Sequence, residues 1–287
     1  MAEWIAPEPP GQDGKAFLSM CLDQATRLLT EANLPMERFF GVGLAISAEI
    51  DREAGVITEA PTFGWSDPIN LREMVADRLH VPLVIETPSI AMTQAEAEFG
   101  KTQGIRNIVT LHCSLGFGMG VRRVGETGSS VDFGRVLTRA KSGTPNPRLL
   151  DELCGGVSVL NELEGIDRIA RLPDSARSTL LSSAVERAKT ENDVAEILRD
   201  RGRLTAQYFG LLLDMLTPDL LMLAGPLAQV PDFVEGFKEE FDIVTASTPD
   251  VLITDMTPTG ASRWLSLRAN IIYGDIDFAA LKERLVA

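Results

Sequence analysis

With 45% apolar and 24% charged residues, the composition is ordinary for a globular protein, and 287 residues are enough for two packed domains. The formal net charge of −14 disfavours contact with phosphates, so we expect this chain not to bind nucleic acid directly. The longest apolar runs, such as 220–226, are too short for a membrane span, and the N-terminus has no secretory pattern, which indicates a cytoplasmic protein without membrane contact.

The first half of the chain alternates between helical and strand-like apolar patterns. Residues 1–14 are rich in Pro and Gly and are predicted to form a linker or an extended edge. In chain order we then predict a helix over 15–33, strands over 41–46 and 55–58, a helix over 71–79, a strand over 83–86, a helix over 90–100, and strands over 108–114 and 118–124.

The second half begins with a segment typical of a loop, 127–147, and then becomes mostly helical. We predict helices over 149–164, 177–189 and 192–216, a buried strand over 220–223, a helix over 231–241, a strand over 251–254, and helices over 261–273 and 277–287.

Strands alternating with helices predict an α/β protein. We expect two domains: a partial N-terminal α/β domain over 1–107 and a C-terminal α/β domain over 108–276. The last helix, 277–287, is expected to pack back on the first domain.

Glycines mark two candidate nucleotide-binding turns. Gly116, Gly118 and Gly120 lie at a predicted strand-to-strand bend, where missing side chains let backbone N–H groups approach a phosphate, although alternating glycines also serve a tight hairpin. Gly225 follows a buried strand and precedes a helix, where it suits either a nucleotide or simply a compact turn.

The cysteine and histidine content predicts no metal centre. Cys21, Cys113 and Cys154 are scattered and odd in number, which fits reduced thiols, and no histidine follows position 132. His80 and His112 are expected to be packed or surface residues and not catalysts.

Several segments occur in the order and spacing of one protein family: 41–46 (GVGLAI), 64–65 (GW), 84–86 (VIE), 96–100, 116–120 and 218–228. On these segments the chain resembles the ROK family (repressors, open reading frames and kinases) over residues 15–275. The resemblance implies the actin-like, ribonuclease H-like two-domain sugar kinase fold and, by family analogy, a homodimer or other homo-oligomer.

The resemblance also implies candidate sugar-binding residues. Glu86 and Thr87 lie in the segment VIETPSIA (84–91), which in the family reads Glu-Asn-Asp-Ala-Asn-Ala. Trp65 matches a tryptophan beside the sugar site, where it either stacks on a pyranose ring or covers the core. Asp132 and Arg135 stand where the family has a sugar-binding glutamate and a histidine that binds sugar or zinc.

Two departures from the family pattern bear on catalysis. Pro88 occupies the position of the aspartate that takes the proton from the sugar hydroxyl, and a pyrrolidine ring cannot accept a proton. The family's opening Asp-x-Gly-Gly-Thr phosphate loop has no counterpart here, so we expect an N-terminally truncated form of the fold. Its zinc-binding cysteine cluster is also absent, and the Arg135 guanidinium cannot ligate metal.

The leading hypothesis is a non-catalytic ROK-type domain, the sugar-sensing and dimerising part of a transcriptional regulator, with no catalytic residue and no cofactor. The alternatives are a ROK sugar kinase using ATP and Mg²⁺, with Glu86 or Asp132 as base, and a scaffold protein with no small ligand.

Overall fold

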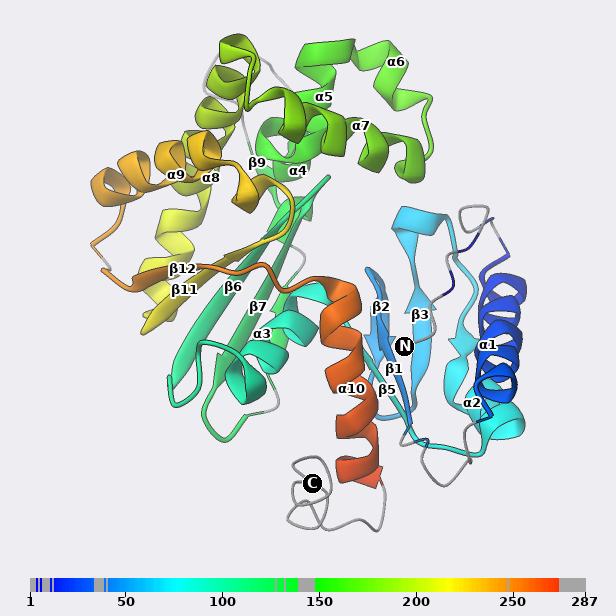
Figure 1. Ribbon diagram of the computed structural model, residues 1–287. Helices are drawn as coiled ribbons and strands as arrows, with labels where there is room; N and C mark the ends of the chain where they lie inside the picture. Colours follow the sequence, from blue (N-terminus) through cyan, green and yellow to red (C-terminus); the bar gives the residue numbers. More distant parts are fainter. Residues whose placement is uncertain are drawn as a thin grey trace. The chain divides into compact units, whose positions relative to one another are not determined.

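The computed structural model describes residues 4, 6, 11, 13–33, 39, 41–126, 128–131, 133–138, 148–246 and 248–273 (Figure 1). The chain divides into two compact units: the first unit comprises Met1–Ala91 and Pro258–Ala287, and the second unit comprises Met92–Thr257. The chain therefore passes from the first unit to the second within a helix, at 91/92, and returns to the first unit at 257/258. No helix in the described ranges has the length and apolar character needed to cross a bilayer.

The first unit contains a two-stranded parallel sheet and a three-stranded antiparallel sheet. Strand β1 (Val42–Ala45) pairs with β5 (Leu83–Glu86), and β2 (Glu49–Asp51), β3 (Val56–Glu59) and β4 (Ile69–Asn70) form the second sheet in that order. Among its described residues, the helices are α1 (Gly14–Glu31), α2 (Leu71–Leu79), α10 (Pro258–Tyr273) and the short 3-10 helix η2 (Pro61–Phe63).

Capping residues fix the start of two of these helices. The Asp13 carboxylate accepts a hydrogen bond from the Ala16 N–H at 2.9 Å, and the Asn70 side chain accepts one from the Glu73 N–H at 3.1 Å. The apolar faces of both helices enter one cluster with the strands, which includes Leu18, Leu22, Ile57, Val75, Leu79, Leu83 and Ile85.

The second unit is built on one five-stranded sheet in the order β12-β11-β6-β7-β8. Strands β6 (Asn107–Cys113), β11 (Leu220–Ala224) and β12 (Asp250–Ile253) are parallel, and β7 (Phe117–Arg123) and β8 (Ser129–Val131) extend the sheet antiparallel. A short antiparallel pair, β9 (Leu137–Thr138) and β10 (Arg148–Leu149), lies outside this sheet.

Helices cover both faces of the five-stranded sheet, as Figure 1 shows. One face packs against α8 (Asn192–Leu216) and α9 (Pro231–Val244). The other meets α3 (Pro88–Phe99), where the Thr93 hydroxyl donates to the Thr110 hydroxyl at 2.6 Å. The other helices in the part of this unit that the structure describes are α4 (Leu150–Cys154), α5 (Gly156–Glu164), α6 (Ile166–Ala170), α7 (Asp174–Arg187), η3 (Phe133–Arg135) and η4 (Leu227–Gln229).

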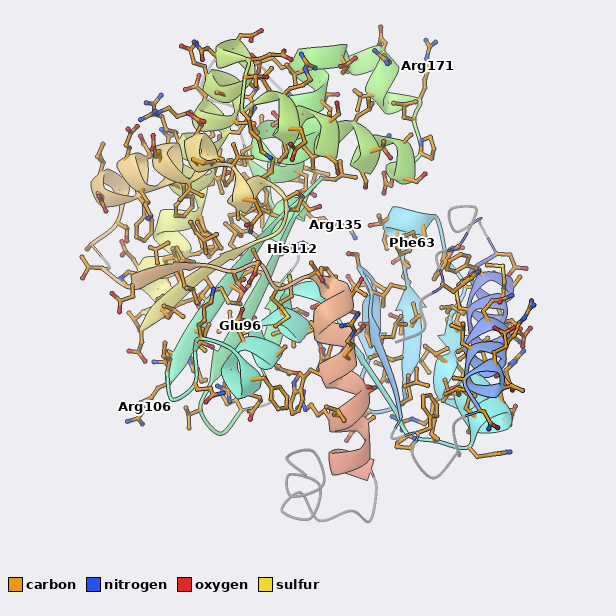
Figure 2. The ribbon with its side chains drawn as sticks, in the orientation of Figure 1. Phe63, Glu96, Arg106, His112, Arg135 and Arg171 are labelled. Carbon is orange, nitrogen blue, oxygen red and sulfur yellow. The ribbon has the colours of Figure 1, made fainter. Side chains whose placement is uncertain are left out.

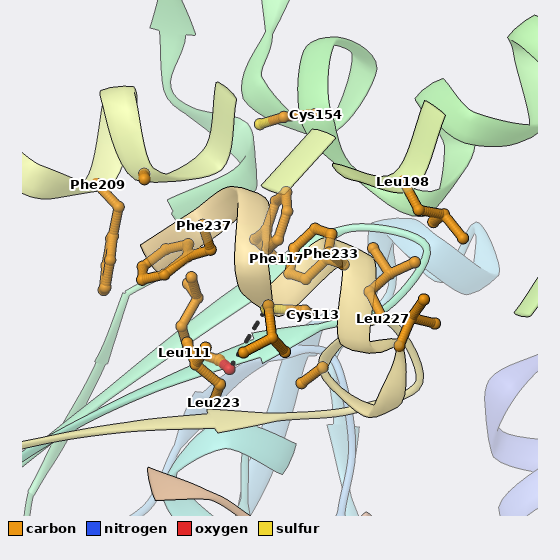
Figure 3. Packing of buried hydrophobic residues seen from close by; sticks show 14 of the residues in the cluster. Leu111, Cys113, Phe117, Cys154, Leu198, Phe209, Leu223, Leu227, Phe233 and Phe237 are labelled. Atoms are coloured by element: carbon orange, nitrogen blue, oxygen red, sulfur yellow. Dashed lines mark hydrogen bonds between the residues drawn. The ribbon is translucent and has the colours of Figure 1, made fainter. Parts of the chain in front are cut away.

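The core of the second unit follows from the alternation of strand residues. Leu111 and Cys113 of β6 point toward α8 and α9, where Phe209, Phe233 and Phe237 are fully buried (Figure 3). These phenylalanines are among the largest fully buried side chains in the described residues, so they supply much of the burial that stabilises the unit.

The structure divides the chain at points that differ from the predicted boundaries at 107/108 and 276/277. Helix α10 packs against β1 and β5, so the described residues from 258 onward belong to the first unit. Residues 92–107 join the second unit, where Thr93 bonds Thr110. The predicted last helix, 277–287, lies outside the described residues.

Two predicted segments are corrected. The predicted helix over 149–164 is interrupted at Gly155, whose extended backbone (φ −74°, ψ 175°) separates α4 from α5. The predicted loop over 127–147 contains β8, η3 and β9 among its described residues. The predicted strand 41–46, the helix 71–79 and the helix 192–216 are confirmed, with β1 slightly shorter than predicted.

Candidate functional site

At the end of β5, the candidate sugar-binding residue Glu86 is buried in an ion-paired arrangement. Its Oε2 accepts a hydrogen bond from Nε of Arg52 at 2.8 Å, and its Oε1 lies 4.0 Å from Nη1 of Arg268 on α10. Burial raises the pKa of Glu86, and the two arginines oppose that shift by favouring the charged form. The carboxylate is therefore engaged by guanidinium groups and is only 5% exposed.

Pro88 suits the structure at the start of α3. Proline is favoured at the first helical position because its missing N–H has no partner there and its fixed φ fits the helix. The carbonyl of the neighbouring Thr87 accepts a hydrogen bond from the Ala91 N–H at 2.9 Å, and its hydroxyl lies 3.4 Å from that of Ser89. Thr87 and Pro88 thus form the entry to the helix.

Trp65 lies in the core of the first unit. It is 3% exposed, its ring centroid is 5.0 Å from that of Phe63 and 6.2 Å from that of Phe17, and its Nε1 donates to the Gly11 carbonyl at 2.8 Å. The structure thus corresponds to the core-covering alternative, because both the ring and its polar group are engaged by the protein.

In the second unit, the bend between β6 and β7 is hydrogen-bonded to the helices α4 and α5. The Phe117 N–H donates to Oδ1 of Asp151 at 2.7 Å. The carbonyls of Ser114 and Leu115 accept hydrogen bonds from Gly156 and Val157, at the start of α5, at 2.9 and 3.0 Å. Several backbone groups of the bend are therefore already used inside the protein.

Asp151 also explains why two positions next to it, 116 and 134, are glycine. A Cβ atom on Gly116 would come within 2.7 Å of Cγ of Asp151, and one on Gly134 would overlap the same carboxylate. Gly134 is buried in η3 next to the sugar-binding candidate Arg135. Asp151 thus joins the bend to the segment 133–135. Asp132 lies outside the described residues.

Gly118 and Gly120 lie within β7 and not in the bend, since β7 begins at Phe117. In the antiparallel ladder they pair with His112 and Thr110 of β6. Of the three glycines predicted to approach a phosphate there, only Gly116 is in the turn.

Gly225 connects β11 to η4 with a left-handed backbone, φ 91°. A Cβ atom here would overlap the carbonyl oxygen of Cys113 and lie 2.7 Å from Cδ2 of His112. Packing against β6 therefore requires a glycine at this position whether or not a nucleotide binds.

His112 lies beside this turn, near the carboxyl end of β6; Figure 2 labels it with Arg135 and Glu96. Burial lowers the pKa of His112 to about 4, so its imidazole is neutral at neutral pH. A neutral ring can donate from one nitrogen and accept at the other, which suits contact with hydroxyl groups.

The lowered pKa predicts acid sensitivity. Between about pH 6.5 and pH 4 the unfolded state binds a proton at His112 that the folded state does not, so stability falls as pH drops through this window. The loss approaches about 3 kcal/mol at the acid end. We expect urea unfolding from pH 7.5 to 4 to show a steeper decline for the natural chain than for His112→Asn. Equal slopes in the two proteins would contradict the assignment.

Sequence reasoning missed Asp151. It lies beside Glu152 in the first turn of α4, where acidic residues are common for helix-dipole reasons, so nothing local distinguishes it. Its contacts come from segments that precede it in the chain, and only the fold brings them together.

In the described part of the chain, no three His, Cys, Asp or Glu side chains are placed to hold a metal ion. Cys113 and Cys154 are buried, and burial raises the pKa of each thiol, that of Cys154 to about 12. Both are therefore protonated and poor ligands or nucleophiles.

Comparison with known proteins identifies the family. The ROK family model matches residues 18–263. The chain is 22% identical to the DNA-binding transcriptional repressor Mlc of Escherichia coli over 240 residues (78% of this chain, 57% of Mlc) and 29% identical to a glucokinase of Streptomyces coelicolor over 101 residues (33% of this chain, 31% of the glucokinase). The chain thus spans less than two thirds of either relative's length.

Among solved structures, the fold is similar to a ROK family glucokinase from Streptomyces griseus in complex with glucose and AMPPNP. The TM-score is 0.67 at 17% identity, covering 92% of this chain and 88% of that one. At this identity the likeness shows the fold alone. The chain has the α/β, actin-like sugar kinase fold and belongs to the ROK family.

Proposed function

We propose that this chain is a non-catalytic ROK domain that binds a sugar and dimerises as part of a transcriptional regulator. The relatives include both repressors and glucokinases, so family membership alone does not choose between them. The choice rests on the site.

The observation that carries the proposal is that the bend between β6 and β7, which contains Gly116, is already hydrogen-bonded to other parts of the protein. Phosphoryl transfer depends on backbone groups that position the phosphates and on a residue that orients the attacking hydroxyl. Here two N–H donors of the bend are already used, because the Phe117 N–H donates to Asp151 and the Ser114 N–H donates to the Gly116 carbonyl. A carboxylate next to a phosphate would also repel it.

The second support is the missing base. The resemblance aligns Pro88 with the proton-accepting aspartate of the kinases, and loss of a general base removes a factor of about 10²–10⁴ in rate. Glu86, the nearest carboxylate in sequence, is ion-paired with Arg52. The resemblance also aligns Arg135 with the family's histidine, and a guanidinium cannot ligate zinc.

Groups suited to a sugar remain. In the first unit the Thr87 hydroxyl directly follows β5. In the second unit the His112 imidazole lies near the carboxyl end of β6 and the Arg135 guanidinium lies in η3. Each of these groups can bond sugar hydroxyls. Ligand binding at the carboxyl ends of strands is the rule in open α/β sheets.

A sugar kinase is the alternative, favoured by the similarity to glucokinases. We expect no ATP-dependent phosphorylation of glucose, xylose or N-acetylhexosamines by the chain in a coupled ADP-release assay. Pro88→Asp should not restore phosphorylation, because Asp151 still accepts the Phe117 N–H of the bend between β6 and β7. A competent ROK glucokinase assayed in parallel is the control.

Saturable turnover that scales with protein concentration would overturn the non-catalytic assignment. Sugar sensing is tested by thermal denaturation, since a ligand that binds only the folded state raises the melting temperature. If no sugar raises it, the scaffold alternative is favoured. Light scattering tests the proposed dimer.

A further inference from the structure

Arg52 is held firmly at the end of the parallel strand pair of the first unit. Its side chain is 41% exposed, whereas that of its partner Glu86 is 5% exposed. Because Glu86 is the last residue of β5, the arginine lies at the carboxyl end of the pair, where α/β sheets bind ligands.

A second arginine fixes the backbone beneath Arg52. Arg72, on α2, donates from Nε to the Ala54 carbonyl at 3.1 Å and from Nη2 to the carbonyls of Glu53 and Arg52 at 3.1 and 3.4 Å. The Asp51 carboxylate accepts the Ala54 N–H at 2.9 Å and so closes the same turn. The guanidinium of Arg52 is thus oriented from both its side chain and its main chain.

The polarity of this strand end differs from that of a site for neutral sugars. A ligand arriving there meets the half-exposed guanidinium of Arg52, while the Glu86 carboxylate is buried. Two guanidinium groups, those of Arg52 and Arg268, flank this one carboxylate, so the cluster has a net positive charge. A guanidinium has only donors and recognises planar anionic groups such as carboxylate and phosphate. Pre-organisation lowers the entropy lost on binding such a group.

From this geometry we propose that the sugar carries an anionic group, a phosphate ester or a carboxylate, and that Arg52 binds it. This inference rests on the proposed sugar-binding function and names its ligand class. It also assigns Arg52, which neither the motifs nor the family resemblance singled out, as the residue that determines specificity for charge.

The test compares matched ligands by thermal denaturation and calorimetry. The panel contains pentoses, hexoses and N-acetylhexosamines, each as the neutral sugar, the phosphate ester and the sugar acid, with inorganic phosphate alone. We expect a phosphate ester or a sugar acid to bind at least about tenfold more tightly than its neutral parent, the size of a charge-assisted hydrogen bond. The two arms distinguish the phosphate from the carboxylate.

Variants locate the effect. Arg52→Gln should lower affinity for the charged sugar at least about tenfold and leave affinity for the neutral parent within about twofold. Arg52→Lys keeps the charge beside Glu86 and should give an intermediate loss, which covers the case in which the glutamine variant folds poorly. Arg27→Gln, on the exposed surface of α1, is the matched control.

The outcomes separate this inference from the proposed function. A neutral sugar that binds as tightly as its charged forms, inorganic phosphate that binds as tightly as the sugar phosphate, or unchanged affinity in both Arg52 variants would overturn the inference alone. If no sugar, charged or neutral, binds, the sensing function itself fails and the inference with it.

Discussion

Replacement of Glu96 by alanine is expected to lower the free energy of unfolding by about 3–5 kcal/mol. Glu96 is 3% exposed on α3, and its carboxylate accepts hydrogen bonds from the Thr254 hydroxyl and, at 2.9 Å, from the Lys101 N–H. Removing it leaves the buried Thr254 hydroxyl and the part-buried Lys101 N–H without their acceptor, at about 1–3 kcal/mol for each, and adds a small cavity. Chemical denaturation measures the loss.

The matched control is Glu98→Ala on the same helix. Glu98 is 44% exposed and pairs with Arg122 at 3.3 Å on the surface, so its loss should cost no more than about 1 kcal/mol. A double-mutant cycle with Thr254→Val should show coupling with Glu96 of about 1–2 kcal/mol. Similar small losses for both glutamates, or simple additivity in the cycle, would show that the buried carboxylate is dispensable.

The contact between Glu96 and Thr254 joins the two segments that connect the units. Helix α3 carries the chain from the first unit into the second at Ala91/Met92, and the return follows Thr254 closely, at Thr257/Pro258. Thr254 is further fixed by its N–H to the Leu223 carbonyl at 3.0 Å and by its carbonyl to the Gln229 amide at 2.8 Å. The two connecting segments are thus joined to one another inside the second unit.

The sequence predicts the elements whose pattern is local. Helix α8 matches the predicted range because Val194, Leu198 and Thr205 recur with helical period on its buried face. The strand ending at Glu86 is also predicted from sequence, because Leu83, Val84 and Ile85 form a short apolar run, and all four of its residues are buried in the structure. The family resemblance, carried by the order of such segments, is confirmed by the match over residues 18–263.

Features that depend on distant contacts could not be predicted in the same way. The break at Gly155 exists because the following N–H groups donate to carbonyls of the β6–β7 bend, and Asp151 is drawn to that bend by the same packing. Arg52 is exposed in a turn, and its partnership with Glu86 spans the chain between β2 and β5. Motif reading found the glycines, but the groups that fill the space beside Gly116 and Gly225 appear only in the fold.

Gly225→Ala is the second change with a large expected effect, and it separates packing from nucleotide binding. The left-handed φ of 91° costs an alanine about 1–2 kcal/mol, and the added methyl overlaps the Cys113 carbonyl, which costs about 1–3 kcal/mol more. We expect a loss of about 2–5 kcal/mol in unfolding free energy without any nucleotide present. Denaturation in nucleotide-free buffer measures it.

Gly64→Ala isolates the contribution of the backbone. Gly64 has a similar φ of 72°, but a Cβ atom there has nothing within 4 Å, so only the conformational cost of about 1–2 kcal/mol remains. An excess loss at Gly225 would therefore measure the contact with β6. The opposite outcome would be that the natural chain binds ATP, that Gly225→Ala does not bind it, and that this variant is no less stable than Gly64→Ala. The glycine would then serve a nucleotide, and the kinase alternative would gain its strongest support.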